Sequence, residues 1–177
     1  MEKKRTDTKS LLAQALFELL SKKTFQKISI NDLCELCDIH RSTFYRHFED
    51  KYQLLRFCFD EISKEMETRM ESKPSKDFFV VMLDNCQKHE KLFFHLFETG
   101  MDEELSEIFY QFSSRHMLEC LKEKESQGVL LPGPIDAMTA FYVGGFTNMV
   151  KRWIKSGYKM PKETLASCLY KLMKDIL

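Results

Sequence analysis

A short polar segment that contains two phenylalanines holds the side chains of this 177-residue chain that are best suited to chemistry. A helix over residues 41–48 turns by about 100° per residue, so Phe44 and Phe48 would lie one turn apart and face the core. The opposite face would expose arginine and hydroxyl side chains, namely Arg41, Ser42, Thr43, Tyr45 and Arg46. Arginine pairs with the edge of guanine, and hydroxyl groups hydrogen-bond to phosphate oxygens. The segment therefore predicts a surface that binds a nucleic acid.

The residues before this segment predict a second short helix. Residues 29–32 have the spacing of a capping box, although aspartate replaces the usual Glu or Gln, and an apolar stripe follows them. A break at residues 38–40 allows a tight turn, because aspartate tolerates positive φ, whereas His40 is a weak N-cap for the next helix. Two short helices joined in this way form a helix-turn-helix, although a plain helical hairpin with a solvated face has the same periodicity.

The rest of the sequence also has helical periodicity. Apolar spacing predicts further helices over about 6–23, 51–73, 76–88, 90–98, 102–126, 135–156 and 162–176, the first of them capped by Thr6 or Asp7. No stretch alternates apolar and polar residues long enough to favour a strand. We therefore expect an all-α protein of about nine helices. Residues 1–60 would form a small N-terminal domain and residues 61–177 a larger helical one.

Residues 6–59 resemble the DNA-binding domain of TetR-type regulators. The resemblance rests on the start of the second helix at 29–34 and above all on the string Thr-Phe-Tyr-Arg-His-Phe at 43–48 followed by Lys51. It implies an N-terminal three-helix helix-turn-helix domain that binds DNA. It also implies which side chains do so: Thr43, Tyr45, His47 and Lys51 at phosphates, and Asn31, Arg41, Ser42 and Arg46 as candidates at bases.

Three positions depart from the family pattern. Glycine is usual where Thr24 and Asp38 stand, and serine or threonine is usual where His40 stands. Thr24 follows the first helix, whereas Asp38 begins the turn and His40 caps the recognition helix. The departures therefore bear on which operator sequence is read rather than on the fold.

Composition argues against a membrane or secreted protein but does not identify the function. The chain carries 27 basic and 27 acidic residues, so its net charge is zero and gives no sign of a nucleic-acid partner. No apolar run approaches the roughly 20 residues that span a bilayer, and the charged start is unlike a signal peptide. We therefore expect a cytoplasmic protein with no membrane partner, whose six scattered cysteines are reduced.

Other candidate sites for chemistry are weaker. Cys34, Cys37 and His40 have a zinc-like spacing, but no fourth ligand lies nearby, so we interpret the two cysteines as small buried residues. The histidines of the second half have no Ser, Cys or Asp partner at a spacing typical of a catalytic site, and the sequence has no Gly-rich phosphate-binding loop. We therefore expect no metal, no cofactor and no enzymatic activity.

The C-terminal half is rich in aromatic residues and methionine. This composition predicts an apolar ligand pocket, although a well-packed core has the same pattern. The candidate pocket residues are Phe78, Met82, Phe93, Phe97, Phe109, Phe112, Phe141 and Tyr142. Apolar ridges on the last two helices predict a dimer interface through Phe141, Gly145, Met149, Trp153, Leu165, Leu169 and Leu172. Residues 144–157 also resemble the short C-terminal domain of a TetR subgroup common in Gram-positive bacteria, which includes regulators of dihydroxyacetone kinase operons.

These observations lead to one main expectation and one alternative. We expect a homodimeric, sequence-specific repressor that binds double-stranded DNA at a palindromic operator and is released by a small apolar effector. The alternative is a ligand-independent helical adaptor or coactivator that binds another regulatory protein. The two differ in whether a small molecule stabilises the C-terminal half.

Overall fold

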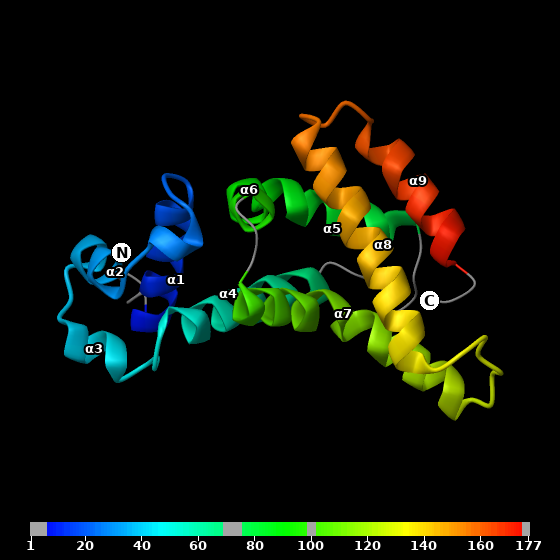
Figure 1. Cartoon of the computed structure of the whole chain (residues 1–177), viewed down its shortest axis with the longest axis horizontal. Helices are drawn as coiled ribbons and strands as arrows, with labels where there is room; N and C mark the ends of the chain where they lie inside the picture. Colours follow the sequence, from blue (N-terminus) through cyan, green and yellow to red (C-terminus); the bar gives the residue numbers. More distant parts are fainter. Residues whose placement is uncertain (1–6, 69–75, 99–101, 175–177) are drawn as a thin grey trace, which may run out of the picture.

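The computed structural model describes residues 7–68, 76–98 and 102–174. Within these ranges it contains α-helices and one short 3-10 helix, and no strand (Figure 1). The elements are α1 (Thr8–Leu20), η1 (Phe25–Lys27), α2 (Ile30–Cys37), α3 (Arg41–Tyr45), α4 (Lys51–Glu67), α5 (Lys76–Lys88), α6 (Glu90–Glu98), α7 (Glu103–Ser126), α8 (Ile135–Lys155) and α9 (Lys162–Met173). The prediction of an all-α protein of about nine helices is confirmed.

Aspartate side chains begin three of these helices. Asp7 caps α1, where its Oδ1 accepts hydrogen bonds from two backbone N–H groups, those of Lys9 at 2.7 Å and Ser10 at 3.1 Å. Asp50 caps α4 and Asp102 caps α7 in the same way. Each carboxylate satisfies N–H groups that have no partner within the helix and carries negative charge at the positive end of the helix dipole.

Two helices end earlier than the sequence predicts. α1 stops at Leu20 rather than residue 23, and α3 stops at Tyr45 rather than Phe48. In both cases the last turn tightens into i→i+3 bonds, such as the 2.9 Å bond from the N–H of His47 to the carbonyl of Phe44. The fourth predicted helix reaches into residues 69–73, which lie outside the described part of the chain; α4 is described to Glu67.

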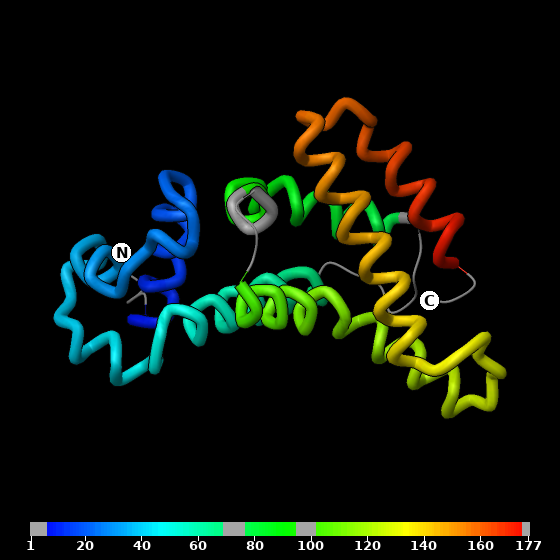
Figure 2. The backbone as a smooth tube through the Cα atoms, in the orientation of Figure 1, coloured from blue at the N-terminus to red at the C-terminus, as the bar shows by residue number. Residues whose placement is uncertain are grey.

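The chain is elongated, and α4 connects its two ends (Figures 1 and 2). α1, α2 and α3 gather at one end, with α8 and α9 toward the other. α4 packs against α1 near its start and against α7 further along. Phe59 of α4 stacks on Phe112 of α7 with ring centroids 4.5 Å apart. α4 thus belongs to the core of both halves. In the described part of the chain, no helix has the length and apolar character needed to cross a bilayer.

Polar contacts also fix α4 along α7. The Tyr52 hydroxyl donates to Asp102 at 2.9 Å, and Asp60 forms an ion pair with Arg115 at 2.7 Å. Partial burial together with Asp102 raises the pKa of Tyr52 to about 12, so this phenol stays protonated and keeps donating. Exposed ion pairs of this kind contribute only about 0–1 kcal/mol each. Their effect is to set the position of α4 rather than to supply much stability.

Candidate nucleic-acid interface

The first helix of the candidate motif, α2, begins with the predicted capping box. The Ser29 Oγ accepts from the backbone N–H of Asp32 at 3.2 Å, and the Asp32 carboxylate accepts from the backbone N–H of Ser29 at 2.7 Å. The Lys23 ammonium lies 2.8 Å from the same carboxylate. Lys23 first, and then the Ser29 groups, hold the pKa of Asp32 well below its usual range. Aspartate therefore serves in place of the usual glutamate, and α2 has a fixed start.

The turn after α2 uses a left-handed residue, as the sequence predicts. Asp38 has a φ of 52°, and the N–H of Ile39 donates to the carbonyl of Cys34 at 3.0 Å, which closes a Schellman-type end. Cys34 is buried, as expected, and the Cys37 thiol donates to the carbonyl of Leu11 at 3.7 Å. Both cysteines thus pack α2 against α1.

Two phenylalanines hold α3 on the domain. Phe44 is completely buried and Phe48 nearly so, with ring centroids 5.9 Å apart, and Phe48 lies 5.7 Å from Phe57 of α4. His40 supplies no side-chain cap, as predicted. A helix of five residues is too short to be stable by itself. Its position therefore depends on these aromatic contacts.

The outer face of α3 is open and polar. Arg41, Ser42 and Arg46 are exposed, and Tyr45 is nearly half exposed. The Arg41 guanidinium donates to the Tyr45 hydroxyl at 3.1 Å and lies over its ring. This contact leaves the phenolic O–H free to donate outward. The face therefore presents two guanidinium groups and two hydroxyls on one short surface, at the end of the molecule farthest from α8 and α9 (Figure 1).

The remaining predicted contact residues are less accessible. Asn31 is exposed on α2, but Thr43 and His47 are half-buried. The Nε2 atom of His47 is buried and has no hydrogen-bond partner among the described residues. A contact between His47 and a phosphate therefore requires its ring to turn outward or to use Nδ1.

Lys51 has a role that the sequence analysis missed. Its ammonium donates to three backbone carbonyls, those of Phe25 at 3.0 Å, Gln26 at 3.1 Å and Ile28 at 2.9 Å, and it lies 4.8 Å from the centre of the Phe25 ring. Burial lowers its pKa. An ammonium group has three protons, and all three are in use. In this conformation Lys51 holds the loop after α1, and its predicted phosphate contact would require one of these bonds to break.

We predict that Lys51→Met lowers the free energy of unfolding by about 2 kcal/mol, because three backbone carbonyls, two of them in partly buried hydrogen bonds, lose a charged donor. Urea unfolding followed by circular dichroism measures the change. Lys27→Met, which removes an exposed lysine from the same loop, should change the value by less than about 0.5 kcal/mol. Equal stability of the two variants would contradict the structural role.

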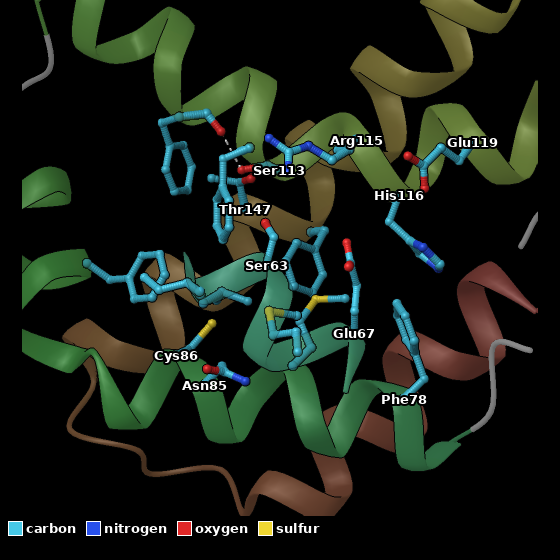
Figure 3. A pocket seen from close by; sticks show the side chains of 18 residues that line it. Ser63, Glu67, Phe78, Asn85, Cys86, Ser113, Arg115, His116, Glu119 and Thr147 are labelled. Carbon is cyan, nitrogen blue, oxygen red and sulfur yellow. Dashed lines mark hydrogen bonds between the residues drawn. The ribbon is translucent and has the colours of Figure 1, made fainter. Parts of the chain in front are cut away.

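A separate cavity lies among α4, α5, α6, α7 and α8 in the C-terminal half (Figure 3). Its volume is about 230 Å³. Five of the predicted pocket residues line it, namely Phe78, Met82, Phe93, Phe109 and Phe112. Two predicted residues do not: Phe141 points to solvent, with 74% of its surface exposed, and Tyr142 lies beside it on α8, away from the cavity. The side chain of Phe97 lies outside the described residues.

The sequence analysis also missed the polar residues of the cavity. Asn85 and Cys86 line it from α5, and Arg115, His116 and Glu119 lie at its other end in Figure 3. Asn85 is only 2% exposed, and neither its Oδ1 nor its Nδ2 has a hydrogen-bond partner among the described residues. Each unpaired buried group costs about 1–3 kcal/mol. No local sequence signal marks such a residue, because an asparagine on an amphipathic helix is normally exposed.

Several members of the predicted dimer interface pack inside the subunit. Trp153, Leu165 and Leu169 are buried within the subunit: α9 packs its apolar ridge on α5, and the Trp153 indole donates to the carbonyl of Met160 at 2.7 Å. These residues are therefore not available to a second chain. The exposed members of the predicted set are Phe141, Gly145 and, with 60% of its surface exposed, Leu172, while Met149 is half-buried.

Comparison with known families agrees with this geometry. Residues 73–175 match a family described as the C-terminal region of transcriptional regulators, and residues 12–57 match the family of bacterial regulatory proteins named after TetR. The chain belongs to the TetR family. It is accordingly a DNA-binding transcriptional regulator rather than an enzyme. The sequence resemblance at residues 6–59 is confirmed.

One relative shares sequence with part of this TetR-family chain. It is the HTH-type dhaKLM operon transcriptional activator DhaS of Lactococcus lactis, which is 31% identical over 58 residues. The match covers 33% of this chain and spans about a third of that relative, 31% of its length.

Solved structures of other transcriptional regulators share the fold. A regulator from Streptococcus agalactiae superposes with a TM-score of 0.71 at 22% identity, covering 93% of this chain and 92% of the other. The regulator FadR of Bacillus subtilis, solved in complex with stearoyl-CoA, gives a TM-score of 0.64 at 14% identity, with 92% and 96% covered. At these sequence identities, the similarity shows that the proteins share a fold.

Proposed function

We propose that this TetR-family regulator is a homodimeric repressor that binds a palindromic operator and leaves it when a small molecule occupies the C-terminal cavity. The main support is the orientation of α3. Phe44 and Phe48 face inward, and Ser42 and Arg46 therefore stand on the open surface at one end of the molecule. Exposed arginine and hydroxyl groups on a second short helix are the chemistry that reads a major groove.

The proposed partner surface is the outer face of α8 with the adjoining part of α9. Phe141, Gly144, Gly145 and Asn148 recur along α8 at helical spacing and are exposed, and Leu172 is exposed on α9. The two glycines have open space where a Cβ would stand, so a second helix can approach this face closely. A twofold partner here would place both copies of α3 on one side of the dimer, as a palindromic site requires.

The proposed signal from cavity to DNA runs through α4. Arg115 lines the cavity and forms an ion pair with Asp60 on α4, and α4 leads back to its first residue, Lys51, and to the turn beside α3. A ligand that moves Arg115 or the α7 backbone changes the contacts that set the position of α4. The distance between the two α3 helices of the dimer would change with it, and operator affinity would fall.

The dimer is tested by Phe141→Glu. We predict a rise of at least about tenfold in the dissociation constant of the dimer, because two carboxylates would be placed in an apolar interface, with a parallel loss of operator binding. Sedimentation equilibrium measures the first effect and fluorescence anisotropy with labelled DNA the second.

Leu130→Glu is the matched control, since Leu130 is 95% exposed in the loop before α8 and lies off the proposed face. It should leave both measurements unchanged. A Phe141→Glu protein that remains dimeric would contradict the proposed interface.

A further inference from the structure

The wall of the cavity contains an unpaired amide group that its phenylalanine side chains cannot hydrogen-bond. Asn85 faces into it from α5, and its amide is buried with both the oxygen and the nitrogen unpaired among the described residues (Figure 3). An amide oxygen accepts and an amide nitrogen donates, whichever way the side chain is flipped. A group that satisfies Asn85 must therefore donate one hydrogen bond and accept another.

The size of the cavity limits the rest of the ligand. Its volume of about 230 Å³ lies below the roughly 300–1,000 Å³ of most pockets for drug-sized ligands. Phenylalanine rings of α5, α6 and α7 form much of the wall. A single ring or a short chain fits this space, whereas a long acyl chain does not fit within it.

The charges around the cavity disfavour an anion. Among the described residues that line it, the one lysine or arginine is Arg115, which is already paired with Asp60 at 2.7 Å, and Glu67 and Glu119 add two negative charges. Burial lowers the pKa of His116, the remaining titratable base, so this ring is neutral at pH 7. A carboxylate or phosphate entering the cavity would meet net negative charge.

We propose that this cavity binds a small, neutral, mainly apolar molecule with one group that both donates and accepts hydrogen bonds, such as a carboxamide, and that Asn85 is the partner of that group. This inference rests on the ligand response proposed above and names its chemical class. It assigns Asn85 the role of selecting the ligand.

The probe is para-propylbenzamide, titrated into the full-length protein by isothermal titration calorimetry, with para-propylbenzoate and butylbenzene as matched probes. The wild type should bind the amide at least about tenfold more tightly than the benzoate. Asn85→Leu should weaken amide binding by about 30-fold, the effect of two lost hydrogen bonds, without weakening butylbenzene. It should also raise the melting temperature by about 2 to 4 °C, because the unpaired amide is gone.

Thr139→Val is the control for this stability effect. Thr139 is also fully buried, its hydroxyl has no hydrogen-bond partner in the described part of the chain, and it does not line the cavity. The variant should raise the melting temperature as well and leave amide affinity unchanged. If Asn85→Leu instead melts at a lower temperature and binds the amide as the wild type does, Asn85 is a structural residue and the inference fails.

The wild-type titrations decide the ligand class without any variant. Tighter binding of the benzoate, or no amide binding at millimolar concentration, overturns the inference. None of these titrations contains DNA. Amide binding that depends on Asn85 but does not release operator DNA would therefore support the inference while contradicting the ligand-responsive repression.

Discussion

Phe44→Ala should lower the free energy of unfolding by about 3–4 kcal/mol and abolish specific DNA binding. The side chain is wholly buried, and its removal takes away both the transfer free energy of the ring and the contacts around the resulting cavity. Its neighbours Phe48 and Tyr45 lie 5.9 and 5.6 Å away, measured between ring centroids. With α3 only five residues long, no other buried side chain of the helix can replace this contact.

Urea unfolding followed by far-UV circular dichroism measures the loss, and fluorescence anisotropy measures DNA binding. Ser42→Ala is the control, because Ser42 lies on the same helix and is exposed. It should change stability by no more than about 0.5 kcal/mol. If Phe44→Ala unfolds at the urea concentration of the wild type, α3 is not held by this side chain and the orientation of the recognition helix is wrong.

Much of the helix-turn-helix could be predicted because its determinants are local. The capping box at Ser29 and Asp32 and the left-handed Asp38 depend on residues within three or four positions of one another. The inward orientation of Phe44 and Phe48 follows from the period of one helix alone. For the same reason the predicted bounds of α5 and α6 agree with the structure.

The contacts that the sequence did not reveal involve residues whose partners are distant in the chain. Lys51 resembles a free cation at a helix start, yet its carbonyl partners are 23 to 26 residues away. Leu165 and Leu169 form an apolar ridge that suits a partner subunit, but α5 covers it within the same chain. Periodicity identifies an apolar face without stating what covers it. Asn85 likewise becomes notable only when tertiary packing buries it.

The proposed regulation also depends on such distant contacts. Asp60 and Arg115 are 55 residues apart, and their pair joins α4 to the wall of the cavity. The pair is partly exposed, so its contribution to stability is small. Because the pair joins the cavity wall to α4, we expect it to transmit the effect of ligand binding to the DNA-binding helices.

The proposed DNA contacts differ in whether they contribute to sequence preference or to affinity for any DNA. Arg46 is exposed, and its side chain has no hydrogen-bond or ion-pair partner among the described residues. Its guanidinium can therefore pair with a guanine edge, which is worth about 1–3 kcal/mol of discrimination. Tyr45 offers one hydroxyl, already accepting from Arg41, whose proton suits a phosphate oxygen. Arg46→Ala should therefore change which sequence is preferred, whereas Tyr45→Ala should weaken binding to all sequences.

The most direct test is competition between the selected operator and a scrambled duplex of equal length, at one fixed salt concentration, for the wild type and both variants. Lys122→Ala is the control, because it removes one positive charge from an exposed position in the last part of α7, and that part of the helix lies at the opposite end of the molecule from α3 (Figure 1). We predict that Arg46→Ala reduces the preference for operator by about 5- to 100-fold, that Tyr45→Ala weakens both duplexes alike, and that the control matches the wild type. Wild-type affinity and preference in both α3 variants would show that this face of α3 does not contact DNA.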